Sequence, residues 1–166
     1  MARPRTIPDP VILAAVRALL SAGGEKAVAF SAVAEATGLA AASLAQRYGG
    51  VLAMIEAAAA DAVDAGLAAL AEMEASQPDK GPQGLLKVMG ELGPDAAVLA
   101  VLMRSQAGRA KADAFRLAVE AALARRLGPK AASAAPILFA AWSGGQFWAT
   151  AGEPAFKLKD VVKRLG

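Results

Sequence analysis

Alanine is the residue that most restricts what this chain can fold into, because 45 of its 166 residues are alanine. Alanine has the highest intrinsic helix propensity, whereas strands favour β-branched and aromatic side chains. Aromatic residues make up 5% of the chain, and no stretch alternates apolar and polar residues as a strand does. The sequence therefore predicts an all-α protein of about nine helices joined by short connections.

Several reaction classes are excluded by residue types that the chain lacks. It contains no cysteine, histidine or asparagine. Disulfides, zinc sites built on thiolate or imidazole, and triads that use histidine as the base are therefore ruled out. The acidic pairs Asp61/Asp64 and Glu72/Glu74 fit the solvated face of a long helix better than a metal site. We expect no enzymatic activity, no cofactor and no metal.

One segment is long enough to cross a membrane. Residues 131–152 carry no charge, and about 20 apolar residues can span a bilayer. The segment consists mostly of alanine, glycine and serine, so its hydrophobicity per residue is weak for a membrane helix. A helix buried in the fold or in an interface is the better interpretation. The first residues also lack the apolar run of a signal peptide, so we expect a cytoplasmic protein with no membrane partner.

Charge is distributed unevenly along the chain. The net charge of +3 is divided into +2 over residues 1–50, −6 over 51–100 and +7 over 101–166. The acidic middle and the basic last third can pair within the fold. The net positive charge also permits a nucleic-acid partner but does not establish one.

Glycine and proline mark where helices begin and end. Asp9 is expected to cap the first helix, and the run from Gln77 to Pro82 is the strongest break in the sequence. The expected helices span about 10–22, 30–38, 41–48, 51–76, 83–91, 95–106, 109–127, 130–151 and 157–165.

Residues 30–48 have the pattern of a helix-turn-helix. Gly38 suits a left-handed turn, and Ala34 is small enough for two helices to cross closely. Val33 and Leu44 can fill the corner between the helices. In a DNA-binding version the second helix enters the major groove. An ordinary corner in an alanine-rich bundle would use the same small residues, so both interpretations stay open.

The wider pattern resembles the tetracycline-repressor (TetR) family. The resemblance covers about residues 8–56 and is carried by Ile12-x-x-Ala15-x-x-x-Leu19-Leu20-x-x-Gly23 and Val33-Ala34-x-x-x-Gly38-Leu39-x-x-x-Ser43-Leu44-x-x-x-Tyr48, followed by a long helix. The alanine-rich helix that reaches Trp142-Ser-Gly-Gly resembles the end of that family more weakly. The resemblance implies a three-helix DNA-binding head at residues 1–50, an all-α ligand-binding body at 51–166, and a homodimer on a double-stranded DNA operator.

The candidate DNA-contacting residues lie on the second helix of the motif, at the end of its first helix and on the N-terminal arm. They are Arg3, Arg5, Thr37, Ala41, Ala42, Ser43, Gln46, Arg47 and Tyr48. The side chain of Gln46 suits adenine, and that of Arg47 suits guanine or a phosphate.

Three positions depart from the family pattern. Ala40 replaces a capping serine or threonine, Ala45 replaces an aromatic residue, and Val51 replaces a frequent lysine. The usual residues contact DNA phosphates, which supply much of the affinity. The sequence therefore leaves two functions open: a ligand-responsive repressor on a palindromic operator, or a TetR-like protein that binds a small molecule or lipid with weak or no specific DNA binding.

Methionines and aromatic residues of the body are candidates for a ligand pocket. They are first of all expected core residues, but such side chains also suit an apolar or aromatic effector. The candidates are Met73, Leu86, Met89, Met103, Phe115, Phe139 and Trp142.

The last two helices carry more apolar surface than a small body can bury. The expected dimer interface comprises Ile137, Leu138, Ala141, Gly145, Trp148, Leu158, Val161, Val162 and Leu165. Two such helices from each of two chains would form a four-helix bundle about a two-fold axis. The alternative is that this face packs only on helices of its own chain.

Overall fold

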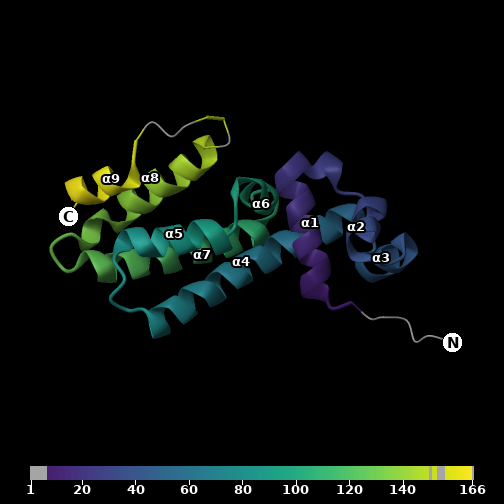
Figure 1. Cartoon of the computed structure of the whole chain (residues 1–166), viewed down its shortest axis with the longest axis horizontal. Coiled ribbons are helices and arrows are strands. Elements are labelled where there is room, and N and C mark those ends of the chain that lie inside the picture. Colours follow the sequence, from purple (N-terminus) through teal and green to yellow (C-terminus); the bar gives the residue numbers. More distant parts are fainter. Residues whose placement is uncertain (1–6, 150, 153–155, 166) are drawn as a thin grey trace.

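The computed structural model describes residues 7–149, 151–152 and 156–165, with no description of the Leu165 side chain. Within these ranges the chain folds into nine α-helices and two short 3-10 helices, and contains no strand (Figure 1). The elements are α1 (Asp9–Gly23), η1 (Glu25–Ala27), α2 (Phe30–Thr37), α3 (Ala41–Tyr48), α4 (Val51–Ser76), α5 (Pro82–Leu92), α6 (Ala96–Leu102), α7 (Gln106–Leu127), η2 (Ala132–Ala134), α8 (Ala135–Trp148) and α9 (Leu158–Leu165). The predicted all-α fold is confirmed.

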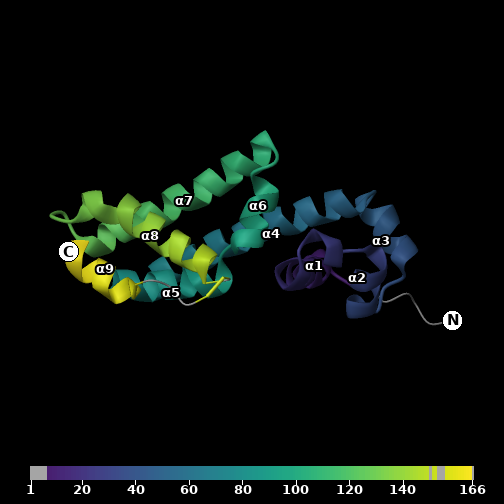
Figure 2. The ribbon, with the colours of Figure 1, turned by 90° about the horizontal axis from the view of Figure 1, so that it is seen from above.

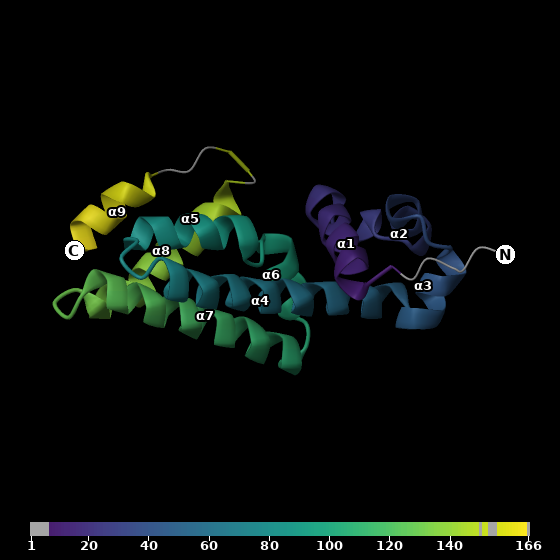
Figure 3. The same cartoon turned by 60° about the horizontal axis from the view of Figure 1, so that its bottom comes forward.

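The long helix α4 connects the two ends of the molecule. Helices α1, α2 and α3 gather around its beginning, and α5, α7, α8 and α9 gather around the remainder (Figures 1 and 2). Helix α6 lies between these groups and contacts α1, α4 and α7. Figure 3 shows α5 and α7 on either side of α4.

Most helix bounds agree with the sequence, and the differences have local causes. Asp9 lies inside the first turn of α1 and makes no capping hydrogen bond, contrary to expectation. Helix α6 ends at Leu102 because Ser105 caps a new helix there, with its hydroxyl accepting from the Gly108 N–H at 2.9 Å. Helix α8 begins only at Ala135, since Pro136 suits the first turn of a helix.

A single hydrophobic core extends along the molecule. It runs from Ile12 of α1 through α4 and α7 to Trp142 of α8, so the two ends are not separated by a polar boundary. Gly66 lets α4 approach its neighbours closely, because a Cβ there would lie 2.9 Å from Phe115 Cε2 and 3.1 Å from Gly93 Cα. Tight packing of this kind makes the body sensitive to added volume.

The uneven charges of the sequence pair between helices. The Lys111 ammonium of α7 lies 2.7 Å from the Asp64 carboxylate of α4. Glu74 of α4 pairs with both Arg125 and Arg126 of α7. Burial alone would raise the pKa of Glu74, but the hydrogen bonds from the two arginines outweigh burial and lower it. The acidic α4 is thus matched to the basic α7 within one chain.

Candidate functional sites

Helices α2 and α3 form the predicted corner. Gly38 adopts a left-handed conformation with φ +73°, and its N–H donates to the Ala34 carbonyl at 2.8 Å. Val33 and Leu44 are fully buried inside the corner. Glycine has no Cβ and therefore adopts this positive φ without steric strain, which allows the tight turn between α2 and α3. The outer side of α3 is therefore free of the packing that holds the corner together.

Five of the candidate DNA-contacting residues are exposed on α3. They are Ala41, Ala42, Ser43, Gln46 and Arg47. Ser43 and Gln46 lie three residues apart, so their side chains share one face of the helix. That face offers one hydroxyl and one amide, which can donate to and accept from base edges.

The side chains of Arg47, which is exposed, and Tyr48, which is half-buried, reach back to the beginning of α1. Arg47 Nε lies 2.8 Å from Asp9 Oδ1, and Arg47 Nη1 donates to the Ile7 carbonyl at 3.0 Å. The Tyr48 hydroxyl donates to Asp9 Oδ1 at 2.7 Å. Burial, together with this hydrogen bond, raises the pKa of Tyr48 to about 12. In this structure Asp9 holds the two side chains at the base of α1, although the sequence suggested that both face DNA.

The remaining candidates of the head are Thr37, Arg3 and Arg5, and their contact with DNA stays a prediction. The Thr37 hydroxyl donates to the Val33 carbonyl at 2.7 Å within α2. Arg3 and Arg5 lie outside the described residues. Ala40 precedes α3 without a side-chain cap, while Ala45 and Val51 are half-buried. The structure places no hydroxyl, aromatic ring or amine at these three positions.

The body contains a cavity of about 1010 Å³ between α5, α6, α7 and α8. Such a volume lies at the upper end of the range of about 300–1,000 Å³ for small-molecule sites. Five of the candidate ligand-binding residues line it: Met89, Met103, Phe115, Phe139 and Trp142. The Phe139 and Trp142 rings pack with centroids 5.5 Å apart and an interplanar angle of 54°.

Two candidates do not line this cavity. Met73 of α4 and Leu86 of α5 are buried in the hydrophobic core. Leu86 precedes Met89 by one turn of α5, and the cavity wall begins only at Met89. Neither side chain therefore reaches this cavity; both pack in the core, which was the first expectation for such side chains.

The cavity wall also carries polar residues that the sequence did not single out. They are Ser21, Asp95, Arg109, Asp113, Arg116, Ser143 and Gln146. The hydrogen bonds from Arg116 to Asp113 and Glu120 raise the pKa of the guanidinium. No local spacing marks these residues, because they come from different helices and meet only in the folded chain.

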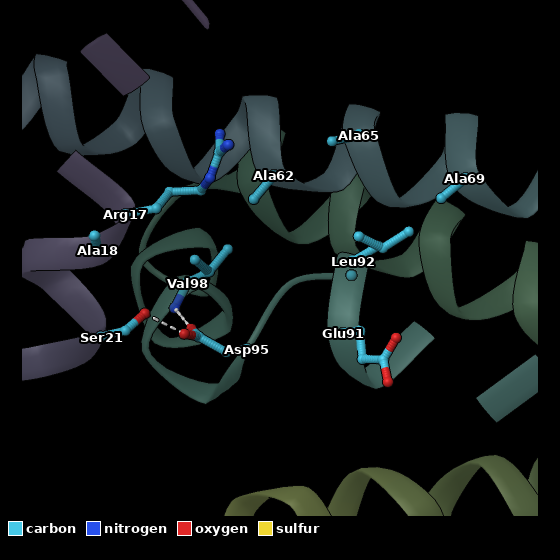
Figure 4. Close-up of a pocket in the computed structure, with 11 residues that line it drawn as sticks. Arg17, Ala18, Ser21, Ala62, Ala65, Ala69, Glu91, Leu92, Asp95 and Val98 are labelled. Carbon is cyan, nitrogen blue, oxygen red and sulfur yellow. Dashed lines mark hydrogen bonds between the residues drawn. The ribbon is translucent and has the colours of Figure 1, made fainter. Parts of the chain in front are cut away.

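A second, smaller pocket of about 360 Å³ lies where α1 meets the body (Figure 4). Arg17 of α1 pairs with Asp61 of α4, and the Ser21 hydroxyl of α1 donates to the Asp95 carboxylate. Figure 4 shows Asp95 between Ser21 and the N–H of Val98. Since Ser21 and Asp95 also line the larger cavity, they connect that cavity to the helix that packs against α2 and α4.

The candidate dimer face is only partly available. Ile137 is 59% exposed and Trp148 is 65% exposed on α8, while Ala141 and Gly145 are half-buried. Leu138 is fully buried within its own chain, so it cannot contact a second copy.

On α9 the stripe is shared with the core of the same chain. Leu158, Val161 and Val162 are half-buried against this core, and the side chain of Leu165 lies outside the description. Contact of the remaining exposed surface of α8 and α9 with a second copy of the chain stays a prediction.

Among the residues that the structure describes, no helix combines the length and the hydropathy that crossing a membrane requires. No three acidic side chains there gather in a way that could hold a metal ion.

Comparison with known proteins finds a similar fold. No protein-family model matches the chain, and no curated protein matches it either. Among solved structures, the chain is similar to the crystal structure of SCO7518, a candidate transcriptional regulator from Streptomyces coelicolor A3(2). The match has a TM-score of 0.60 at 18% sequence identity and covers 94% of each chain. The fold is shared. At this identity the likeness says nothing further about function.

Proposed function

We propose that the protein is a ligand-responsive DNA-binding transcriptional regulator of the TetR type, acting as a repressor that binds a palindromic operator as a homodimer. The observation that carries the proposal is the outer face of α3. It projects Ser43 and Gln46 from a closed helix-turn-helix whose packing does not use them. A helix held in this way can enter the major groove and present these side chains to base edges.

The cavity of the body supports the ligand-responsive part of the proposal. Its wall is mostly apolar and aromatic, which suits an apolar or aromatic effector. An effector that binds one arrangement of α6 more tightly would increase the population of the matching position of helices α1–α3. If the helices in that position fit the operator less well, operator affinity falls.

Selection from a random DNA library, followed by binding titrations on the selected site, tests the proposal. Gln46→Ala is expected to relax the preference at one base position, with a cost of about 1–3 kcal/mol in discrimination. Gln83→Ala is the matched control, because Gln83 is an exposed glutamine on α5, far along the chain from α3. If the wild-type protein selects no sequence even at low salt, DNA recognition is refuted.

A specific observation favours the second candidate, a TetR-like protein that binds a small molecule or lipid without an operator. Arg47 is the basic residue of α3, and its guanidinium is engaged by Asp9 and the Ile7 carbonyl. Phosphate contacts from basic side chains supply most non-specific DNA affinity. Ligand binding that persists in a protein without DNA affinity would establish this alternative.

A further inference from the structure

Two side-chain N–H groups meet at one place on the wall of the larger cavity. Gly90 of α5 has no side chain, and the Gln146 amide nitrogen lies closer than van der Waals contact to the position that a Cβ on Gly90 would occupy. The indole nitrogen of Trp142 lies 3.9 Å from the same position. All three residues line the cavity. The glycine therefore leaves space in which two donors from α8 converge.

Neither donor has a partner among the described residues. No hydrogen bond joins Trp142 Nε1 or Gln146 Nε2 to any residue in the described ranges, although Trp142 is 8% exposed. Trp142 Nε1 nevertheless remains open to the cavity, and Gln146 is exposed, so water can reach both N–H groups in the empty cavity. A ligand that fills the cavity would remove both groups from water and would then need to offer an acceptor.

The remaining wall limits the chemistry of such a ligand. Met89, Phe115 and Phe139 present apolar and aromatic surface, which favours a flat aromatic skeleton. The charged side chains of the wall do not favour a charged ligand of either sign, because positive and negative groups are equal in number in the described ranges. They are Arg109, Arg116, Asp95 and Asp113. Arg116 is moreover already paired with Asp113 and Glu120.

We propose that the cavity binds an uncharged aromatic ligand whose carbonyl-type oxygen accepts hydrogen bonds from Trp142 Nε1 and Gln146 Nε2. The inference rests on the small-molecule role in the proposed function and names the chemistry of that ligand. Gly90 determines the specificity by leaving room for the amide of Gln146. An alanine at this position would force the amide of Gln146 to move from its present place on the cavity wall.

A matched set of naphthalene probes tests the inference on the full chain by equilibrium dialysis. The set consists of 2-acetonaphthone, 2-ethylnaphthalene and 2-naphthoate, which present a ketone, a hydrocarbon and a carboxylate on the same ring system. Trp142→Phe and Gln146→Leu are each expected to weaken ketone binding about threefold to tenfold, as loss of one hydrogen bond does. For Gln146→Leu, binding of the hydrocarbon is expected to change less than about twofold, since this variant removes no ring contact. Trp142→Phe keeps an aromatic ring on the wall but a smaller one, so its loss for the hydrocarbon is expected to stay below its loss for the ketone.

Gln83→Leu is the control for Gln146→Leu, because Gln83 is exposed on α5 and does not line the cavity. Gln146→Leu keeps the inference testable if Trp142→Phe fails to fold, since Gln146 is exposed. Equal losses for ketone and hydrocarbon would overturn the hydrogen-bond assignment, as would 2-naphthoate as the tightest probe. If no probe binds, the small-molecule role fails as well, which distinguishes that failure from loss of the ketone preference alone.

Discussion

The Ser21 hydroxyl donates a hydrogen bond to Asp95, and Asp95 Oδ1 accepts the N–H of Val98 at 2.8 Å. One carboxylate therefore caps α6 and binds α1. Asp95 also lines the large cavity. A ligand that displaces the beginning of α6 would therefore also move α1 through the hydrogen bond between Asp95 and Ser21, and α2 packs against α1.

We expect Ser21→Ala to uncouple ligand binding from DNA binding. The variant should retain both affinities, while the ligand's effect on operator affinity should fall severalfold, within the usual coupling of about 1–3 kcal/mol. Ser133→Ala is the control, since Ser133 is exposed in η2. Fluorescence anisotropy of a labelled operator, with and without ligand, measures the coupling. An unchanged ligand effect in Ser21→Ala would show that the signal takes another route.

The single tyrosine of the chain reports on the contact between α3 and α1. Burial and the hydrogen bond to Asp9 raise the pKa of Tyr48 from 10.0 to about 12. The folded chain therefore keeps this proton to higher pH than the unfolded chain. The stability that the contact contributes is present below about pH 10 and is lost as pH rises through 12.

Absorbance of the phenolate at alkaline pH measures this midpoint without interference from other tyrosines. Asp9→Asn should lower the midpoint toward 10, because it removes the carboxylate charge beside the phenol. The conservative variant Asp61→Asn is the control, since Asp61 acts on Tyr48 more weakly than Asp9 does. A wild-type midpoint near 10 would mean that Tyr48 is not held by Asp9 in solution.

Local signals in the sequence account for most of the fold. The bounds of α3 and α4 follow from Gly38, the pair Gly49-Gly50 and the break after Ser76, all of which act within a few residues. The same is true of the closed corner between α2 and α3. Such features depend on local backbone conformation and on the spacing of apolar residues, and both can be predicted from neighbouring residue types.

The candidate sites were predicted less completely, because they depend on contacts between distant segments. Residue type alone predicted several side chains of the cavity wall, because methionine and aromatic residues suit an apolar ligand, as Met89 and Phe139 show. Nothing local to Gln146 indicates that it meets Gly90, and nothing local to Arg47 indicates that Asp9 would hold it. These pairs form only because the folded chain brings α8 near α5 and the end of α3 near the beginning of α1.

The close approach of α4 to its neighbours predicts opposite effects of two glycine substitutions. Gly66→Ala should lower the free energy of unfolding by about 1–3 kcal/mol, because its Cβ would press on Phe115 and on the backbone of Gly93. Gly144→Ala, inside α8, meets nothing within 4 Å and should raise it by about 0.5–1 kcal/mol. Urea denaturation of both variants measures the difference. Equal effects would contradict the tight packing at Gly66.

The exposed apolar side of α8 predicts a homodimer. Ile137 and Trp148 remain largely exposed in the single chain, and Ala141 and Gly145 between them are small enough for a second helix to approach closely. Sedimentation equilibrium at micromolar concentration should therefore give twice the chain mass of 16.7 kDa. Trp148→Glu should give a monomer, because a buried unpaired carboxylate would cost the interface several kcal/mol.

Leu52→Glu is the control for this last experiment, since Leu52 is 53% exposed at the beginning of α4, at the opposite end of the molecule from α9. It should leave the dimer intact. The monomeric Trp148→Glu variant should also lose operator affinity, because two half-sites bound together are held far more tightly than either alone. A wild-type mass of one chain would refute the dimer, and the exposed side of α8 would then serve another contact.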